Sequence, residues 1–102
     1  MALKLNEFAQ EVHRNAVEHG WWEEEPSFGD VIALCHAELS EALEEYLDAL
    51  GKKPEGIAVE LADCMLRILD WCGKNNIDIE AILREKQEYN KTRPYRHGGK
   101  AL

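Results

Sequence analysis

Residues 34–70 read LCHAELSEALEEYLDALGKKPEGIAVELADCMLRILD. In this stretch, apolar residues recur at helical spacing on both sides of the GKKP segment at 51–54. A glycine commonly ends a helix, and a proline suits the first turn of the next one. We therefore expect one helix that ends near Leu50 and another that runs from about Pro54 to residues 71–74. Their short connection favours antiparallel packing.

The sequence before this stretch predicts one more helix and a capped start for the helix that ends near Leu50. Apolar residues recur at helical spacing over about 3–19, and Gly20 stops the pattern. Ser27 is a good N-cap, because Asp30 three residues later can complete a capping box with it. No alternating pattern is long enough to predict a strand.

The sequence after this stretch predicts a fourth helix and an irregular tail. Asp78 suits the N-cap of a helix over about 79–90. Pro94 and two glycines interrupt the basic segment 91–102, which therefore cannot be regular helix. Together the helices predict an all-α fold, in which residues 1–102 form a single domain arranged as a four-helix bundle.

The third predicted helix is apolar around most of its circumference, which indicates burial on most sides. One broad face carries Ile57, Leu61, Cys64, Met65, Ile68, Trp71 and Cys72, and the other side carries Val59 and Leu66. A 102-residue domain is marginally stable alone and buries such a helix more easily in an assembly. We therefore expect a homodimer or homotetramer that completes the bundle.

Composition narrows the class of protein. A net charge of −8 argues against binding to a nucleic acid polymer, which needs clustered cations. The apolar runs are far shorter than the roughly 20 residues that span a bilayer, and nothing resembles a signal peptide. We therefore expect a cytoplasmic protein without a membrane partner. The three cysteines lie in apolar helical stretches without a zinc-binding spacing, which predicts reduced, buried thiols.

Two acidic pairs are the clearest candidates for a functional site. Glu38 and Glu41 lie three residues apart on one predicted helix, and Glu60 and Asp63 repeat this spacing on the next. If the two helices pack antiparallel, the four carboxylates converge at the seam, where their repulsion favours a divalent cation. An all-oxygen ligand set suits Mg²⁺, with Mn²⁺ as a substitute.

The acidic spacing also has other interpretations. Acidic residues three or four positions apart are common on solvated helix faces, as we expect for Glu44, Glu45 and Asp48. A di-iron carboxylate bundle uses similar ligands but requires a glutamate three residues before a histidine, and no histidine in this sequence has one.

With its acidic pairs and their surroundings, the chain resembles the MazG-like all-α nucleoside triphosphate pyrophosphatases. The resemblance rests on LCHAELSEALEE at 34–45, EGIAVELADCMLRILD at 55–70 and KQEYNKTRPYRHGGK at 86–100, in this order. It implies a helical bundle that dimerises or tetramerises, with sites near subunit interfaces. It also implies Mg²⁺-dependent hydrolysis of a nucleoside triphosphate between its α and β phosphates, which gives monophosphate and pyrophosphate and suits cleaning of the nucleotide pool.

The resemblance assigns roles to particular residues. It implies metal ligation by Glu38, Glu41, Glu60 and Asp63, with either Glu38 or Glu41 orienting the attacking water and Lys86 assisting catalysis at the phosphates. It implies substrate contacts from Trp21, Trp22, Lys86, Asn90, Arg93, Tyr95, His97 and Lys100. Both tryptophans offer flat faces for base stacking, although either one can equally be interface core. The basic tail also has a simpler interpretation as a solvated helix C-terminus.

The neighbourhood of the acidic pairs contains two further polar residues. Arg67 follows Asp63 by four positions, which predicts an ordinary ion pair within the helix. Asp70 lies on the same face and is expected to support Arg67 or the metal ligands.

Two other functions remain open, namely an inactive metal-binding helical bundle and an acidic helical module for protein interaction. The base preference does not follow from the sequence.

Overall fold

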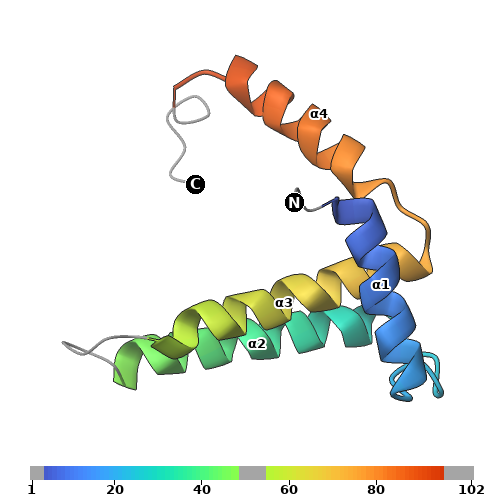
Figure 1. Ribbon diagram of the computed structural model, residues 1–102. Coiled ribbons are helices and arrows are strands. Elements are labelled where there is room, and N and C mark those ends of the chain that lie inside the picture. Colours follow the sequence, from blue (N-terminus) through green and yellow to red (C-terminus); the bar gives the residue numbers. More distant parts are fainter. Residues whose placement is uncertain (1–3, 49–54, 96–102) are drawn as a thin grey trace.

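The fold is all-helical, as a computed structural model of the chain shows (Figure 1). The structure describes residues 4–48 and 55–95, and within these ranges it contains four helices and no strand. The helices are α1 (Leu5–Glu18), α2 (Phe28–Asp48), α3 (Glu55–Lys74) and α4 (Ile79–Thr92). The predicted all-α class and the order of the helices are therefore confirmed. The predicted connection between α2 and α3 lies outside the described residues.

Helices α2 and α3 lie side by side and antiparallel (Figure 1). Their shared core consists of Val31, Cys35 and Cys64, which are buried, and two partly buried indole rings pack against it. Within the described residues all three cysteines are buried and free of disulfides, as predicted. Antiparallel packing brings the acidic part of α2 beside the acidic part of α3, and this contact positions the candidate site.

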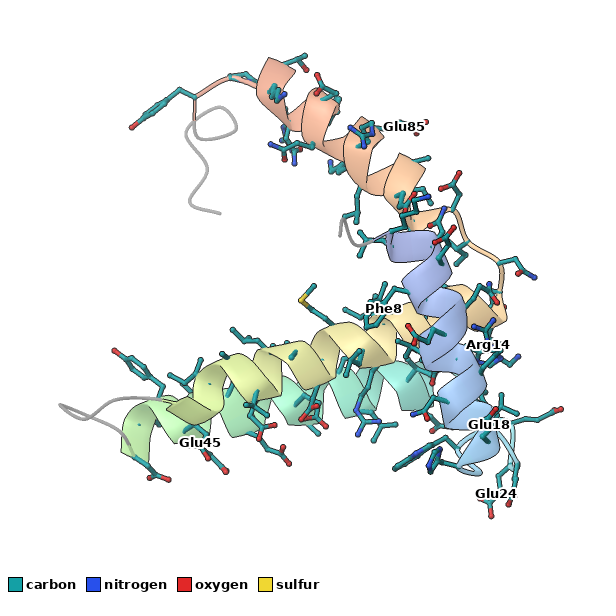
Figure 2. The ribbon with its side chains drawn as sticks, viewed as in Figure 1. Phe8, Arg14, Glu18, Glu24, Glu45 and Glu85 are labelled. Carbon is teal, nitrogen blue, oxygen red and sulfur yellow. The ribbon has the colours of Figure 1, made fainter. Side chains whose placement is uncertain are left out.

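Helix α1 crosses the C-terminal half of α3, with Phe8 at the crossing (Figure 2). The buried core there contains Ala9, Leu69 and Cys72. Gly73 permits the close approach, because a Cβ atom at this position would overlap the backbone carbonyl of Ala9. Small residues on both helices therefore determine how closely they cross.

Helix α3 ends within the range predicted from the sequence, at residues 71–74. The helix continues to Lys74, and the chain leaves it through Asn76, whose φ of 52° is left-handed. The Ile77 amide donates to the Cys72 carbonyl at 3.0 Å, which completes a Schellman-type ending. Gly73 itself packs against α1, and the left-handed residue of the turn is Asn76.

The other helix boundaries follow the predicted local chemistry. The Ser27 amide donates to Asp30 Oδ2 at 2.9 Å, and the Asp30 amide donates to Ser27 Oγ at 3.1 Å, which confirms the capping box. Asp78 accepts a hydrogen bond from the Ala81 amide at 3.1 Å and caps α4. Gly20 has a φ of 83° and ends α1 as expected.

Helix α4 packs against α1 and extends away from the α2–α3 pair (Figure 1). The junction is polar, because the Asn6 side chain donates to Asp78 and its carbonyl oxygen accepts from the Glu80 amide. The radius of gyration is 16.4 Å, whereas a compact domain of this length has about 13 Å. A single chain therefore does not close its four helices around one core.

Many large apolar side chains are exposed on the single chain. They include Leu39, Leu43, Val59, Leu61, Met65 and Ile68 on the α2–α3 pair, and Ile82, Leu83 and Tyr89 on α4. Exposed apolar surface of this extent is typical of surfaces that contact another molecule. None of the described helices has the length and apolar character needed to cross a membrane.

Candidate metal centre and adjoining pocket

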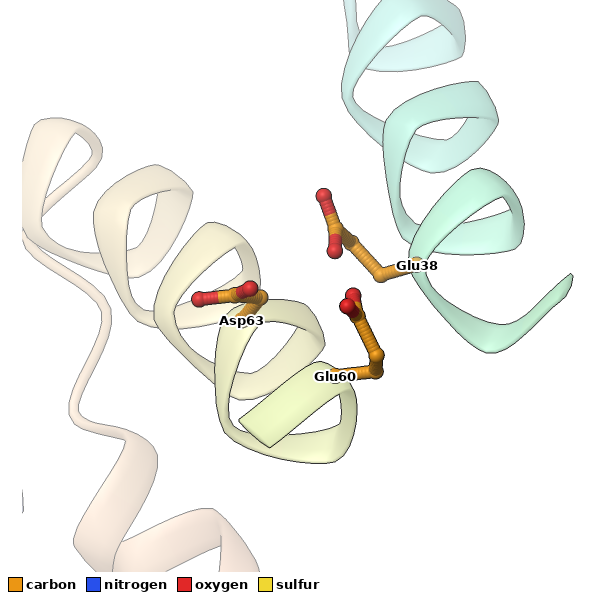
Figure 3. A group of neighbouring side chains, drawn as sticks. All are labelled: Glu38, Glu60 and Asp63. Carbon is orange, nitrogen blue, oxygen red and sulfur yellow. The ribbon is translucent and has the colours of Figure 1, made fainter. Parts of the chain in front are cut away.

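Three acidic side chains meet at the seam between α2 and α3 (Figure 3). Glu38 reaches from α2, and Glu60 and Asp63 project from α3. One carboxylate oxygen of each lies within 4.8 Å of the other two. Glu38 is only 8% exposed, which is unusual for a glutamate. The predicted convergence of acidic residues from two helices is therefore present.

Two carboxylate oxygens in this cluster are buried without a hydrogen-bond partner, namely Glu38 Oε2 and Glu60 Oε2. A buried, unpartnered carboxylate oxygen is costly, and a proton or a cation can relieve the cost. The pKa of Glu60 rises from its ordinary 4.5 to about 7, mainly because the protonated carboxyl hydrogen-bonds to Glu41 and Glu38. The set consists of oxygen donors alone, which fits a hard divalent cation such as Mg²⁺.

Glu41 lies at the edge of this cluster rather than within it. Its side chain is exposed, and it reaches the Glu60 carboxyl without joining the three closely spaced oxygens. The sequence therefore predicted four converging carboxylates, of which the structure brings three together and leaves Glu41 beside them. Glu44, Glu45 and Asp48 are exposed further along α2, as expected for a solvated face.

Arg67 corrects one expectation from the sequence. It was expected to pair with Asp63 on its own helix, but its Nε and Nη2 atoms donate to Glu38 Oε1 on α2, at 3.1 and 3.0 Å. The expectation failed because the antiparallel packing places a buried acceptor from α2 within reach of Arg67. A cation of the protein therefore contacts one edge of the acidic cluster.

A pocket of about 330 Å³ opens beside the acidic cluster. Its walls include Trp21, Trp22, Leu34, Glu38, Asp63 and Arg67. Trp21 is 59% exposed, and the Arg67 guanidinium lies over its ring, 5.7 Å from the centroid. The pocket thus combines aromatic and apolar walls with carboxylates and one guanidinium, and both tryptophans predicted to contact substrate line it.

Trp22 is fixed more firmly than Trp21. Its Nε1 donates to both carboxylate oxygens of Asp70, at 2.9 and 3.1 Å, and His13 Nδ1 lies 2.8 Å from the same carboxylate. The Lys74 ammonium lies 5.1 Å from the centroid of the indole ring. Asp70 therefore orients Trp22 and does not bind Arg67, and its role was missed because its partners come from distant parts of the sequence.

The basic residues predicted to contact phosphate do not lie at this pocket within one chain. Lys86 and Asn90 are exposed on α4, which extends away from the α2–α3 pair (Figure 1). The Lys86 ammonium lies 4.6 Å from the centroid of the Tyr89 ring. Arg93 and Tyr95 follow the end of α4. The remaining predicted contacts, His97 and Lys100, lie outside the described residues.

Comparisons with protein-family models, with curated proteins and with solved structures give no match to this chain.

Proposed function

We propose that the protein is a Mg²⁺-dependent nucleoside triphosphate pyrophosphohydrolase, which cleaves between the α and β phosphates. The observation that supports this most strongly is the cluster of Glu38, Glu60 and Asp63, with two buried, unpartnered oxygens, beside a pocket that Trp21 and Trp22 line. An acidic cluster alone can be a solvated surface. Burial of Glu38 and the adjoining pocket favour a ligand site instead.

Glu38, Glu60 and Asp63 are the residues that would hold the cation, with Glu41 close enough to Glu60 to contribute. When bound, Mg²⁺ neutralises phosphate charge and lowers the pKa of a coordinated water. Glu38 or Glu41 accepts a proton from the attacking water in this proposal, and the arrangement of the carboxylates does not distinguish them. Without a cation, the cluster is electrostatically unfavourable for a triphosphate, and this supports the proposed requirement for a metal ion.

The pocket walls suit the nucleoside half of such a substrate. Trp21 and Trp22 present aromatic surface to a pocket that also contains Glu38 and Asp63, so that a stacked base would place its phosphates toward the carboxylates. The hydrogen bonds from Trp22 to Asp70 keep that ring in one orientation. Trp21 has the Arg67 guanidinium over its ring and is more exposed, which suits adjustment to a ligand.

A second copy of the chain completes the site in this proposal. Lys86, Asn90, Arg93 and Tyr95 lie on or after α4, away from the acidic cluster of their own chain. Both α4 and the α2–α3 pair expose large apolar residues, which self-association would bury. The basic segment is complementary in charge to the acidic cluster, and this favours a homodimer or homotetramer in which the segment reaches a neighbouring site.

The deciding experiment is a screen of ribo- and deoxyribonucleoside triphosphates with Mg²⁺, in which monophosphate and pyrophosphate are measured separately. We expect equal amounts of both products, loss of turnover on chelation, and loss in Glu60→Gln. The matched control is Glu44→Gln, which removes one acidic charge from an exposed position on α2. Release of orthophosphate in place of pyrophosphate would contradict the proposed bond cleavage.

An acidic protein-interaction module is a second candidate, favoured by the exposed apolar residues on α2 and α3. This candidate requires neither a metal ion nor turnover. It predicts that Glu60→Gln leaves all properties unchanged except the local charge, whereas Met65→Glu prevents association with the partner. A protein that binds no divalent cation and hydrolyses no nucleotide, but associates through this face, would support it.

A further inference from the structure

Arg67 connects the acidic cluster with the aromatic pocket. Both of its hydrogen bonds to Glu38 end on the same oxygen, Oε1, while Glu38 Oε2 has no partner. The guanidinium also lies over the Trp21 ring and forms part of the pocket wall. One side chain therefore contacts a buried member of the acidic cluster and the exposed ring at the pocket.

The ion pair between Arg67 and Glu38 compensates a buried negative charge in the metal-free protein. Glu38 is almost fully buried beside Glu60 and Asp63, and an ionised carboxylate there requires a nearby positive charge. Arg67 supplies this charge from α3, across the helix seam. A divalent cation would supply it as well, and two cations on one carboxylate repel each other. The guanidinium and a divalent cation would therefore compete for the Glu38 carboxylate.

The adjoining pocket offers Arg67 a second place to bind when it releases Glu38. Its side chain is partly exposed and lines the open pocket together with Trp21. An anionic group in this pocket would be a strong acceptor, because guanidinium groups bind phosphate through paired N–H donors. Arg67 can therefore bind Glu38 in the metal-free protein and a phosphate group in the protein with substrate.

We propose that Arg67 neutralises Glu38 in the metal-free protein. Once a divalent cation binds to Glu38, Arg67 releases this carboxylate and binds the triphosphate of the substrate instead. The inference rests on the acidic cluster being the metal site of the proposed function. It makes Arg67 a residue that couples metal loading to nucleotide binding. The alternative is a permanent ion pair, in which Arg67 keeps Glu38 in place for the cation.

The two alternatives predict opposite changes in metal affinity. To test this, nucleotide-free wild type and Arg67→Gln are titrated with Mn²⁺. Electron paramagnetic resonance measures the concentration of free Mn²⁺ at each point, which gives the affinity of each protein for the ion. Exchange predicts that Arg67→Gln binds Mn²⁺ about tenfold more tightly, because a charge-assisted hydrogen bond no longer competes. A permanent ion pair predicts weaker binding, and that result, or no binding in either protein, overturns the proposal.

The control is Arg84→Gln, which removes the same charge from an exposed position on α4. We expect its Mn²⁺ affinity to stay within about twofold of wild type, since charges beyond about 8 Å are screened at physiological salt. Equal tightening in both variants would show a general charge effect and overturn the proposal. Arg67→Lys keeps the charge but loses the forked donors, so its Mn²⁺ affinity should rise less than in Arg67→Gln. It also provides the test if the glutamine variant does not fold, and weaker binding than wild type would then contradict exchange.

The second half of the exchange is tested with inorganic triphosphate, which needs no assumption about the base. At saturating Mn²⁺, Arg67→Gln should bind it about tenfold more weakly than wild type and Arg84→Gln. Unchanged affinity would overturn the transfer to phosphate. Neither titration depends on turnover. A protein that shows both shifts but hydrolyses no nucleotide refutes the proposed function alone, and an active enzyme without the shifts refutes this inference alone.

Discussion

Glu38 on α2 and Glu60 on α3 face each other across an antiparallel helix seam, and each buries one carboxylate oxygen without a hydrogen-bond partner. The two acids are 22 positions apart in the printed sequence, and only the packing of α2 on α3 brings them together. Arg67 offsets only part of the repulsion in such a pair, so a shared proton or a bound cation would stabilise it further. We therefore expect the stability of the protein to depend on pH and on divalent cations.

Stability of the metal-free protein should fall as the pH rises from about 4.5 through about 7. The pKa of Glu60 is raised to about 7 in the folded protein, so the folded state holds a proton that the unfolded state releases near 4.5. The stabilisation is complete below the lower value and lost above the higher one. Thermal unfolding in chelator, for wild type and Glu60→Gln, measures it. The difference between the two proteins should change with pH, and a constant difference contradicts the raised pKa.

Millimolar Mg²⁺ should raise the melting temperature at pH 8. A cation that binds only the folded state at about ten times its dissociation constant adds about 1.4 kcal/mol, which corresponds to several degrees for a domain of this size. Glu38→Gln and Glu60→Gln should lose most of the rise, and Glu44→Gln should keep it. Equal responses in all four proteins would place the cation elsewhere.

Gly73→Ala should destabilise the protein by about 1–3 kcal/mol, because the added methyl group overlaps the Ala9 carbonyl and α1 must shift on α3. Gly29→Ala is the matched control, since a Cβ there meets only the Ser27 hydroxyl at an ordinary contact distance of 3.6 Å. Urea unfolding followed by circular dichroism compares the two. A Gly73→Ala protein as stable as Gly29→Ala would show that the crossing is looser than described.

Lys86→Ala should keep the helix content, the oligomeric state and Mg²⁺ binding of wild type. Its turnover should fall by roughly 10²-fold, the scale for loss of one charge-stabilising donor. The control is Arg84→Ala, on the same exposed helix, which should retain nearly all activity. Pyrophosphate release on samples characterised by circular dichroism and light scattering compares them. Near-normal turnover in Lys86→Ala would show that the basic segment is only a solvated helix terminus without a role at the phosphates.

Light scattering at micromolar concentration should show a particle larger than the 11.7 kDa chain. Met65→Glu should shift the population toward the monomer, because Met65 is 59% exposed on α3 and an interface would bury its side chain. Its helix content should stay close to that of wild type, since the residue contributes little to the core of one chain. A wild-type protein that is monomeric at these concentrations contradicts the shared site.

Features determined by neighbouring residues were predictable from the sequence. The Ser27–Asp30 capping box and the Asp78 cap depend on residues within one turn, and both are present as predicted. The convergence of Glu38 with Glu60 and Asp63 was also predictable, because helical spacing and one antiparallel pairing suffice to bring them together.

Features that depend on contacts between distant segments were not predictable. Arg67 was paired with the wrong acid because the burial of Glu38 is known only once α2 and α3 have docked. The close approach of α1 to Gly73 was not predicted, because the sequence does not show that α1 crosses there. The position of α4 depends on the polar junction of Asn6 with Asp78 and Glu80, which joins segments far apart in the sequence.

The outward course of α4 has a consequence for how two chains would share activity. If Lys86 of one chain serves the carboxylates of another, each catalytic centre takes its acidic and basic halves from different molecules. Activity per chain then declines on dilution, because separated chains have only half-sites. Mixing two impaired proteins, one carrying Glu60→Gln and the other Lys86→Ala, would then restore activity, since the hybrid assembly would contain one site with both halves intact.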